Sequence, residues 1–351
     1  MGTNTDLLKG LIWRILNHPE GFAGEVVVAE NVQPIGVNDF ARTPANAEDQ
    51  DQSVADVVAV FAGLGHPVST FNWTTLNAAA LAGGEMGTGP ASCEYAQGNA
   101  ADAYVLLDDP NVDARNVYSY PKFTTAQGRR LSMRHGLWDG TTYRSERLCL
   151  INLPVLKRHG MAGATAAWKN FVGFISCRGF DSEDNARFSS WDEMHGYFWG
   201  YQGLGPADYG LIGRQLALVR APDLNIIDAV WVATIDNFSS PSAVRLDTIL
   251  ASRDPFAADW YATEYLLRPV VPDSPSDSSL ARPGTFRAAS MVNQKAAKAL
   301  WQGSYPFVDF VADHGEDAVL PAERDQMNAY LGRVATMPPA VNAILLEEGT
   351  A

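Results

Sequence analysis

Residues 151–175, INLPVLKRHGMAGATAAWKNFVGFI, carry the most informative pattern in the chain. The apolar run 151–156 predicts a buried strand, and the polar residues 157–159 predict a turn after it. Two glycines then indicate a bend, after which an apolar run interrupted only by Lys169 and Asn170 predicts a helix. Because an unpaired buried ammonium is costly, a Lys-Asn pair inside an apolar helix indicates that these side chains have a function there.

Strand and helix patterns alternate on both sides of this stretch. Short β-branched or apolar runs predict strands, and longer runs with helical periodicity predict helices. The predicted strands include 24–30, 66–73, 102–109, 224–232 and 244–252, and the predicted helices include 53–64, 207–221, 254–267 and 286–300. This order requires crossover connections and predicts an α/β fold, in which a mostly parallel or mixed central sheet carries helices on both faces.

Two regions depart from this alternation. Residues 110–145 carry short β-like runs between turn signals, which predicts an antiparallel, β-rich excursion. Residues 177–206 are rich in glycine, aromatic and acidic residues, which predicts an inserted segment. The loop expected at 269–284 is not a domain linker, since the amphipathic helices after it need the main body. We therefore predict a single α/β domain over 1–351, with insertions at about 76–145 and 177–206.

Composition limits the classes of protein to which the chain can belong. It has 351 residues, of which 46% are hydrophobic and 19% charged, and its net charge is −14. These fractions are typical of a globular protein and exclude wholesale disorder. The negative charge argues against non-specific nucleic-acid binding, which needs a basic surface. No apolar run approaches the ~20 residues that span a bilayer, so no transmembrane segment is expected.

The first residues predict a helix capped by Asn4, Thr5 or Asp6. They do not resemble a secretory leader, because they lack a long apolar core and a small-residue cleavage site. The location expected for this chain is therefore cytoplasmic. Export is the expectation if an upstream leader has been removed.

The chain has three cysteines, Cys93, Cys149 and Cys177, without CxxC spacing. Ligation of an iron–sulfur cluster or a structural zinc ion by four thiolates is therefore excluded within one chain. Cys149 lies in an apolar run, so we expect it in the core. Free thiols fit a reducing compartment.

Four blocks of the sequence resemble the domain of unknown function 362 family. They are LPVLKRH (153–159), GATAAWKNFVGFI (163–175), LNIIDAVWV (224–232) and LDTILASRDPFAADWYATEYLL (246–267). In the family pattern, a strand ends in Pro-x-x-Lys-x-His, a Thr-x-x-x-Lys-Asn helix follows, a later strand ends in Asp, and a last helix opens with Asp-Pro. The matching residues here are Pro154, Lys157, His159, Thr165, Lys169, Asn170, Asp228, Asp254, Pro255 and Asp259.

The resemblance implies little about activity, since the family is generally unassigned. Some of its members are joined to ferredoxin-type iron–sulfur modules, and some carry twin-arginine export leaders. This sequence shows neither feature. Neither the redox partner nor the compartment of those members therefore carries over. A ferredoxin-type electron carrier as partner and redox or lyase-type carbon chemistry as reaction are candidates that the family's association with ferredoxins suggests.

The polar residues of these blocks form the candidate substrate site. Thr165 and Lys169 lie four residues apart and are expected on one helix face, with Asn170 beside it and Thr165 as the N-cap. A helix start beside two lysines, Lys157 and Lys169, is a natural receptor for a carboxylate or phosphate. We assign substrate binding to Lys157, Thr165 and Asn170. The alternative is that Lys169 pairs with a buried acid and that Asn170 anchors a loop.

Catalysis is assigned to His159, Lys169 and Asp228. Histidine titrates near neutrality, which suits His159 as general acid or base. Asp228 is expected at the carboxyl end of a strand, as the partner of His159 or as a cation ligand. His159, His195 and Asp228 are also the candidate ligands of a divalent transition metal, iron or manganese, although their spacing gives this set no support. For His195, a surface histidine packed among aromatic residues is the alternative.

The leading functional hypothesis is an enzyme, an oxidoreductase or lyase, that binds a small anionic organic substrate at the carboxyl ends of the central strands. The alternative is a non-catalytic accessory protein that holds a metal or cofactor, or docks an electron carrier. Its acidic charge would suit a basic partner. The sequence contains no GxxxxGK[ST] loop and no GxSxG elbow, so P-loop nucleotide binding and serine-hydrolase chemistry are not expected.

Overall fold

The computed structural model describes residues 2–30, 40–43, 47–72, 102–107, 118–159, 163–171, 210–234, 243–271 and 286–308. The chain divides into two compact units, and the described residues up to Leu148 form the first unit and those from Cys149 onward the second. The single domain predicted over 1–351 stays a prediction. Within the described part of the chain, no helix is long and apolar enough to cross a membrane.

Two helices of the first unit begin at side-chain caps. The helix α1 (Thr5–Leu16) begins after Asn4, whose side-chain oxygen accepts hydrogen bonds from the N–H groups of Asp6 and Leu7. The helix α2 (Val54–Gly63) begins at a capping box formed by Ser53 and Asp56. Because such bonds satisfy N–H groups that have no partner within the helix, they determine where each helix starts. Both helices were predicted from the sequence.

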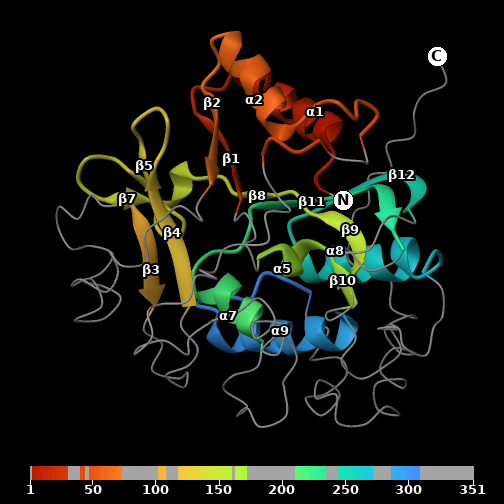
Figure 1. The fold of residues 1–351 in the computed structure, drawn as a ribbon. Coiled ribbons are helices and arrows are strands. Elements are labelled where there is room, and N and C mark those ends of the chain that lie inside the picture. The colour runs from red at the N-terminus through yellow and green to blue at the C-terminus, as the bar shows by residue number, and fades with distance from the viewer. Residues whose placement is uncertain are drawn as a thin grey trace, which may run out of the picture. The chain divides into compact units, whose positions relative to one another are not determined.

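A parallel strand pair and an antiparallel sheet complete the first unit (Figure 1). β1 (Val26–Glu30) pairs in parallel with β2 (Val68–Asn72), and α2 lies between them in the chain. The antiparallel sheet follows the chain order β3 (Ala103–Leu107), β4 (Tyr118–Thr124), β5 (Arg130–Ser132), β6 (Gly136–Trp138) and β7 (Tyr143–Arg144). The β-rich excursion expected at 110–145 is confirmed, and it also takes in β3.

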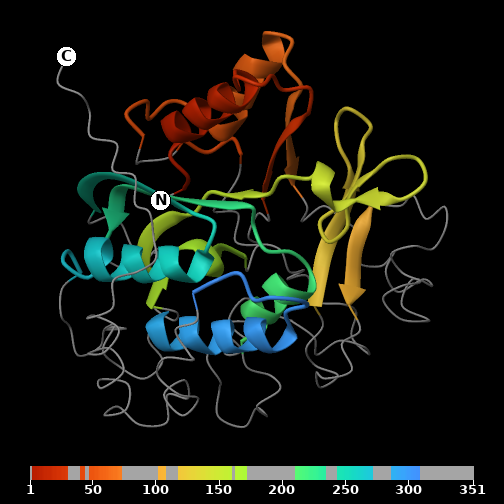
Figure 2. The same cartoon turned by 180° about the vertical axis from the view of Figure 1, so that it is seen from behind.

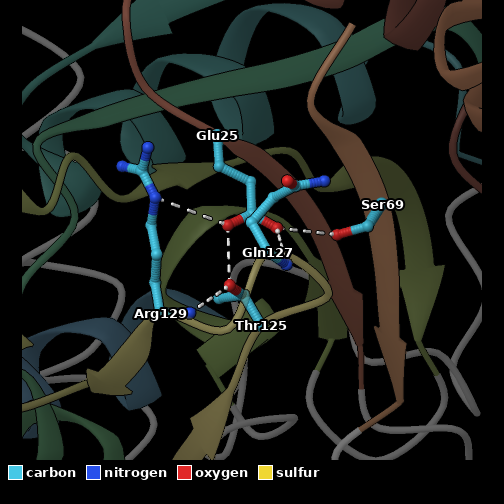
Figure 3. Close-up of polar contacts among 5 residues, drawn as sticks. All are labelled: Glu25, Ser69, Thr125, Gln127 and Arg129. Carbon is cyan, nitrogen blue, oxygen red and sulfur yellow. Dashed lines mark hydrogen bonds and ion pairs between the residues drawn. The ribbon is translucent and has the colours of Figure 1, made fainter. Parts of the chain in front are cut away.

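One buried carboxylate joins these two parts of the first unit (Figure 3). Glu25, just before β1, has a side chain that is only 3% exposed. It accepts hydrogen bonds from the hydroxyls of Thr125 at 2.6 Å and Ser69 at 3.3 Å, and from the N–H of Gln127 at 3.4 Å. The Nε of Arg129 lies 4.0 Å away. Glu25 therefore ties the parallel pair to the β4–β5 turn.

The second unit contains a five-stranded mixed sheet. Its strands are β8 (Ile151–Asn152), β9 (Val155–His159), β10 (Gly163–Thr165), β11 (Leu224–Ala233) and β12 (Ala243–Ser252). β11 pairs in parallel with β8 and β9 and antiparallel with β12, while β10 pairs antiparallel with β9. The α/β class with a mixed sheet is thus confirmed, although the described strands form three sheets rather than one central sheet.

Residues 157–159 continue β9 and do not form the expected turn. Each has a partner in β10, so their backbone groups belong to a β-hairpin. Gly163, with φ at 88°, adopts the left-handed conformation that glycine allows. The helix expected after the bend is reduced to α5 (Ala167–Asn170), because the chain first forms β10.

The other helices of the second unit are α7 (Leu211–Leu218), α8 (Pro255–Tyr261), the π-helical continuation η5 (Ala262–Leu267) and α9 (Phe286–Leu300). Asp254 caps α8 with Pro255 in the first turn, as the sequence predicts. α7 and α9 lie side by side in both views (Figures 1 and 2). Their backbones approach closely where the N–H of Gly213 donates to Asn293 Oδ1 at 2.8 Å.

Aromatic side chains fill the interior of each unit. Tyr120 is buried in the first unit, where Phe123 stacks on Phe71 with ring centroids 3.9 Å apart. Trp168 and Phe256 are buried in the second unit. Such side chains bury the most apolar area per residue and dominate the stability of a core. Cys149, expected in the core, is exposed because it precedes the first strand of its sheet.

Candidate functional site

Three candidate residues share one face of the β9–β10 hairpin. Side chains alternate along a strand, so Lys157 and His159 project from the same face of β9. Thr165 is the antiparallel partner of Lys157, and directly opposed residues project from the same face. Gly163 lies opposite His159 and has no side chain. We call Lys157, His159 and Thr165 the hairpin cluster.

The members of the hairpin cluster differ in exposure. Lys157 and Thr165 are half-buried, whereas His159 is only 6% exposed. Within the part of the chain that the structure describes, no hydrogen bond involves the Thr165 hydroxyl. An ammonium and a hydroxyl on opposed residues can bind one oxyanion, because both donate hydrogen bonds from the same side. An imidazole two residues along β9 can then exchange a proton with the bound molecule.

Asp228 projects from the same face of the sheet as the hairpin cluster, but it is offset from His159 along the strand direction. It occupies the middle of β11 rather than the expected carboxyl end, and it is fully buried. Its parallel partner is Val155, four residues before His159. At the usual rise per residue, this offset is about 13 Å along the strand. The register therefore argues against a direct hydrogen bond between Asp228 and His159.

The same offset bears on the expected metal site. A transition-metal ion holds nitrogen and oxygen ligands at about 2.0–2.2 Å, so its ligand atoms must lie close together. The register of His159 and Asp228 argues against that arrangement. Among the described residues, no group of three His, Cys, Asp or Glu side chains could hold a metal ion. His195 lies outside the described residues, so its role as a ligand stays a prediction.

The start of α5 is occupied by a side chain of the protein itself. The carboxylate of Asp259, on α8, accepts hydrogen bonds from the N–H groups of Ala167 and Trp168, the latter at 2.9 Å. The expected anion receptor at this helix start is therefore wrong, since Asp259 takes its donors. Thr165 is also not the N-cap, because it lies in β10 and the capping position is Ala166.

Asp259 is fully buried, and its surroundings act on its charge in opposite directions. Burial raises the pKa of Asp259 well above its usual value, because the interior disfavours the ionised form. The two N–H bonds lower the pKa, and the nearby carboxyl of Asp254 raises it further. Burial dominates, so Asp259 resists ionisation more than an exposed carboxyl does.

Lys169 and Asn170 occupy different environments on α5. Lys169 is 7% exposed and lies in the interior, whereas Asn170 is exposed. The two adjacent side chains project about 100° apart around a helix. Lys169 therefore lies beneath the surface, whereas Asn170 lies where a ligand can reach it.

A chain of three amide side chains supports α5, and we call it the amide chain. Asn170 Nδ2 donates to Asn152 Oδ1 at 2.7 Å. Asn152 Nδ2 donates to the carbonyl of Ala167 at 2.8 Å and to Asn225 Oδ1 at 2.9 Å. Asn225 Nδ2 donates to the carbonyl of Ser252 at 3.1 Å. The bonds link α5 to strands β8, β11 and β12.

Asn152 and Asn225 are absent from the sequence-based candidates. Each is buried and stands alone in an apolar strand run, INLPVL for Asn152 and LNIID for Asn225. A buried amide needs hydrogen-bond partners, so a lone asparagine in such a run is a signal that could have identified both residues.

Fold and site together define an α/β protein with a polar cluster at the strand-to-helix connection of its second unit. Residues 144–264 match the family described as Domain of unknown function (DUF362). This match confirms the resemblance of the four sequence blocks to the family. The match includes the hairpin cluster, α5, β11 and α8. Comparisons with curated proteins and with solved structures found no match.

Proposed function

We propose that the chain is an enzyme that binds a small anionic organic substrate at the hairpin cluster. The observation that supports this proposal is the pairing of Lys157 with Thr165 across the hairpin. It sets a positive charge and a hydroxyl side by side, with Lys157 in the middle of β9 and Thr165 at the end of β10. An oxyanion bound there would receive one charged and one neutral hydrogen bond, which is a common arrangement for carboxylates and phosphates.

The remaining candidate residues receive separate roles. His159 lies two residues from Lys157, about 7 Å along the strand, and is the proposed general acid or base. The buried Lys169 raises the positive potential beneath the site and favours the anion. Asp228 is buried on the same face of the sheet, and its catalytic role stays a prediction. The assignment of Asn170 to substrate binding stays a prediction.

The groups of the hairpin cluster supply binding and proton transfer. A site that binds an anion and transfers a proton suits lyase-type carbon chemistry, in which a base removes a proton next to an anionic group. Redox chemistry is the other proposed class, with a ferredoxin-type partner as the electron carrier. The acidic net charge of −14 would suit a basic partner.

Ligand-induced thermal stabilisation tests the anion site. Wild type, Lys157→Met and Lys298→Met are melted with a panel of carboxylates and phosphate at matched ionic strength. Lys298 is exposed on α9, so Lys298→Met removes one positive charge from the same unit but from another element than the hairpin. A bound anion at 100 times its Kd stabilises the folded state by about 2.7 kcal/mol. We expect this stabilisation in wild type and Lys298→Met, and its loss in Lys157→Met.

Equal stabilisation of Lys157→Met and wild type would show that the anion site is assigned wrongly. A second variant, His159→Gln, separates binding from catalysis. It should retain anion binding and lose turnover of any substrate found in the panel. Anion binding without turnover across the panel would instead favour a non-catalytic accessory role.

A further inference from the structure

Ala167, the first residue of α5, is held by hydrogen bonds at both of its backbone groups. Its N–H donates to the carboxylate of Asp259 on α8, and its carbonyl accepts from Asn152 Nδ2, on β8, at 2.8 Å. The N–H of the next residue, Trp168, donates to the second oxygen of Asp259 at 2.9 Å. Ala167 and Trp168 are fully buried, so their backbone groups depend on partners within the protein. The start of α5 is therefore fixed by elements that lie far from it in the chain.

The carboxylate of Asp259 serves this one connection. Among the described residues, its hydrogen-bond partners are the N–H groups of Ala167 and Trp168 alone, and no cation lies within ion-pair distance of it. Burying a carboxyl group costs free energy that only specific partners offset, and Asp259 is fully buried. Its two hydrogen bonds therefore determine where one peptide segment lies.

That segment continues directly from the strand that carries Thr165. β10 has three residues and lies at the edge of its sheet, so among the described strands only β9 pairs with it. Thr165 is the last residue of β10 and lies opposite Lys157. One residue, Ala166, separates Thr165 from Ala167, which limits the distance between the Cα atoms of Thr165 and Ala167 to about 7 Å. The hydrogen bonds at Ala167 therefore restrain the end of β10 at which Thr165 lies.

We infer that Asp259 is a positioning residue of the anion site. Through the N–H of Ala167, it keeps Thr165 opposite Lys157, so that the hydroxyl and the ammonium group meet the same oxyanion. A site that is ordered before the ligand arrives loses less entropy on binding. Asp259 acts through the backbone and does not contact the anion. The inference rests on the proposed anion site and adds the residue that maintains its geometry.

Calorimetric titration with inorganic phosphate and with succinate, at matched ionic strength, tests the inference. Thr165→Val removes the hydroxyl and should weaken binding about two- to tenfold, the range of one neutral hydrogen bond. Asp259→Asn keeps the shape of the side chain but sets a donor against one of the two N–H groups, so it should weaken binding by up to the same factor. The double variant Thr165→Val/Asp259→Asn should bind no more weakly than Thr165→Val, because Asp259 acts through the hydroxyl that is already absent.

Asp254→Asn is the matched control. Asp254 lies on the same side of the sequence block, five residues before Asp259, and its carboxylate accepts from the N–H groups of Phe256, Ala257 and Val308, none of which belongs to α5. Asparagine is as good an N-cap as aspartate, so α8 should keep its start. We expect the phosphate and succinate affinities of Asp254→Asn to equal those of wild type. A general loosening of α8 would instead weaken binding in both variants.

The outcomes separate the inference from the proposal on which it rests. Unchanged affinity in Asp259→Asn, equal weakening in Asp254→Asn, or a loss that adds in full to that of Thr165→Val would overturn the role of Asp259 and leave the anion site standing. If wild type bound neither probe, the anion site and the inference would fall together.

Amide hydrogen exchange of wild type gives the test if circular dichroism shows that Asp259→Asn does not fold. Coupling between two sites is reciprocal, so a bound probe should stabilise the hydrogen bonds to Asp259. We expect the N–H groups of Ala167 and Trp168 to exchange more slowly when the anion is bound, by a larger factor than the N–H groups of α7. Equal factors in α5 and α7 would overturn the inference.

Discussion

The carboxylate of Asp259 accepts a hydrogen bond from the backbone N–H of Trp168 at 2.9 Å, although the two residues are 91 positions apart in the chain. The same carboxylate also accepts from the N–H of Ala167. Asp259 thereby holds α5 from one side, while the amide chain holds it through Asn170 and the carbonyl of Ala167. The short helix that presents Asn170 is therefore positioned by residues distant in sequence.

The first prediction concerns the pH dependence of stability. Burial raises the pKa of Asp259 above its usual 3.8 in the folded protein. At pH values between the usual pKa and the raised pKa of the folded protein, the folded state holds a proton that the unfolded chain has released. The free energy of unfolding therefore falls as pH rises through this window. Below the usual value both states are protonated, and the contribution is fully present. Asp259→Asn cannot ionise, so its stability should fall less over the same window.

Urea denaturation of wild type and Asp259→Asn across a series of pH values measures this difference. The asparagine keeps one acceptor oxygen for the N–H groups of α5, and its second group is a donor, so its stability at low pH should be lower. The readout is the slope of the free energy of unfolding against pH in each protein. The difference between the two slopes reports Asp259, because the contributions of all the other titratable groups are common to both proteins. Parallel profiles would contradict the predicted role of burial.

The second prediction concerns the buried indole of Trp168. Its Nε1–H donates to Ser290 Oγ at 2.7 Å, and the residue is fully buried. In a double-mutant cycle of Trp168→Phe and Ser290→Ala, we expect a coupling energy of about 0.5–1.5 kcal/mol, the net contribution of one hydrogen bond. Chemical denaturation of the four proteins gives this energy. Strict additivity of the two single losses would show that the bond does not stabilise the fold.

The third prediction ranks two residues of the first unit. Glu25→Ala leaves the Thr125 hydroxyl and the N–H of Gln127 without their acceptor, which should cost about 1–3 kcal/mol. Arg129→Ala should cost less than about 1 kcal/mol, because its side chain is 39% exposed and its Nε lies 4.0 Å from the carboxylate. Free energies of unfolding of the two variants test the order. A greater loss in Arg129→Ala would mean that the ion pair outweighs the hydrogen bonds.

The fourth prediction compares one substitution at two helical glycines. A Cβ at Gly213 would overlap the backbone carbonyl of Asn293 and force α7 away from α9. Gly213→Ala should therefore destabilise the protein by about 1–3 kcal/mol. At Gly10 in α1 a Cβ meets no atom within 4 Å, so Gly10→Ala should stabilise by about 0.4–1 kcal/mol. Thermal melts of both variants measure the opposite signs, and a loss in both would contradict the account.

Several elements were predictable because their signals are local. The cap of α1 at Asn4 and the start of α8 at Asp254-Pro255 depend on side chains that bond N–H groups within three residues. The strands β1 and β11 were predicted from apolar runs, and α9 was predicted with its observed bounds from its periodicity. The family likewise followed from short blocks of consecutive residues.

The region 157–170 shows where local signals were insufficient. The polar residues after the strand predict a turn, yet pairing with β10 extends β9 through His159. Thr165 and Lys169 have helical spacing, yet Thr165 lies in a strand and contributes to a different face. The polarity of Lys157 and His159 favoured a loop, but the hydrogen bonds of the hairpin outweigh that preference.

The amino-acid sequence alone determined the family resemblance, the α/β class, the helix caps and most of the strands, since periodicity, capping and short motifs depend on residues close together in the chain. The tertiary structure alone decided that Thr165 lies opposite Lys157, that Asp228 lies four residues away from His159 in the sheet, and which amides orient Asn170. The physical reason is that strand register and buried hydrogen bonds join segments far apart in the chain, and their free energy exists only when those segments meet.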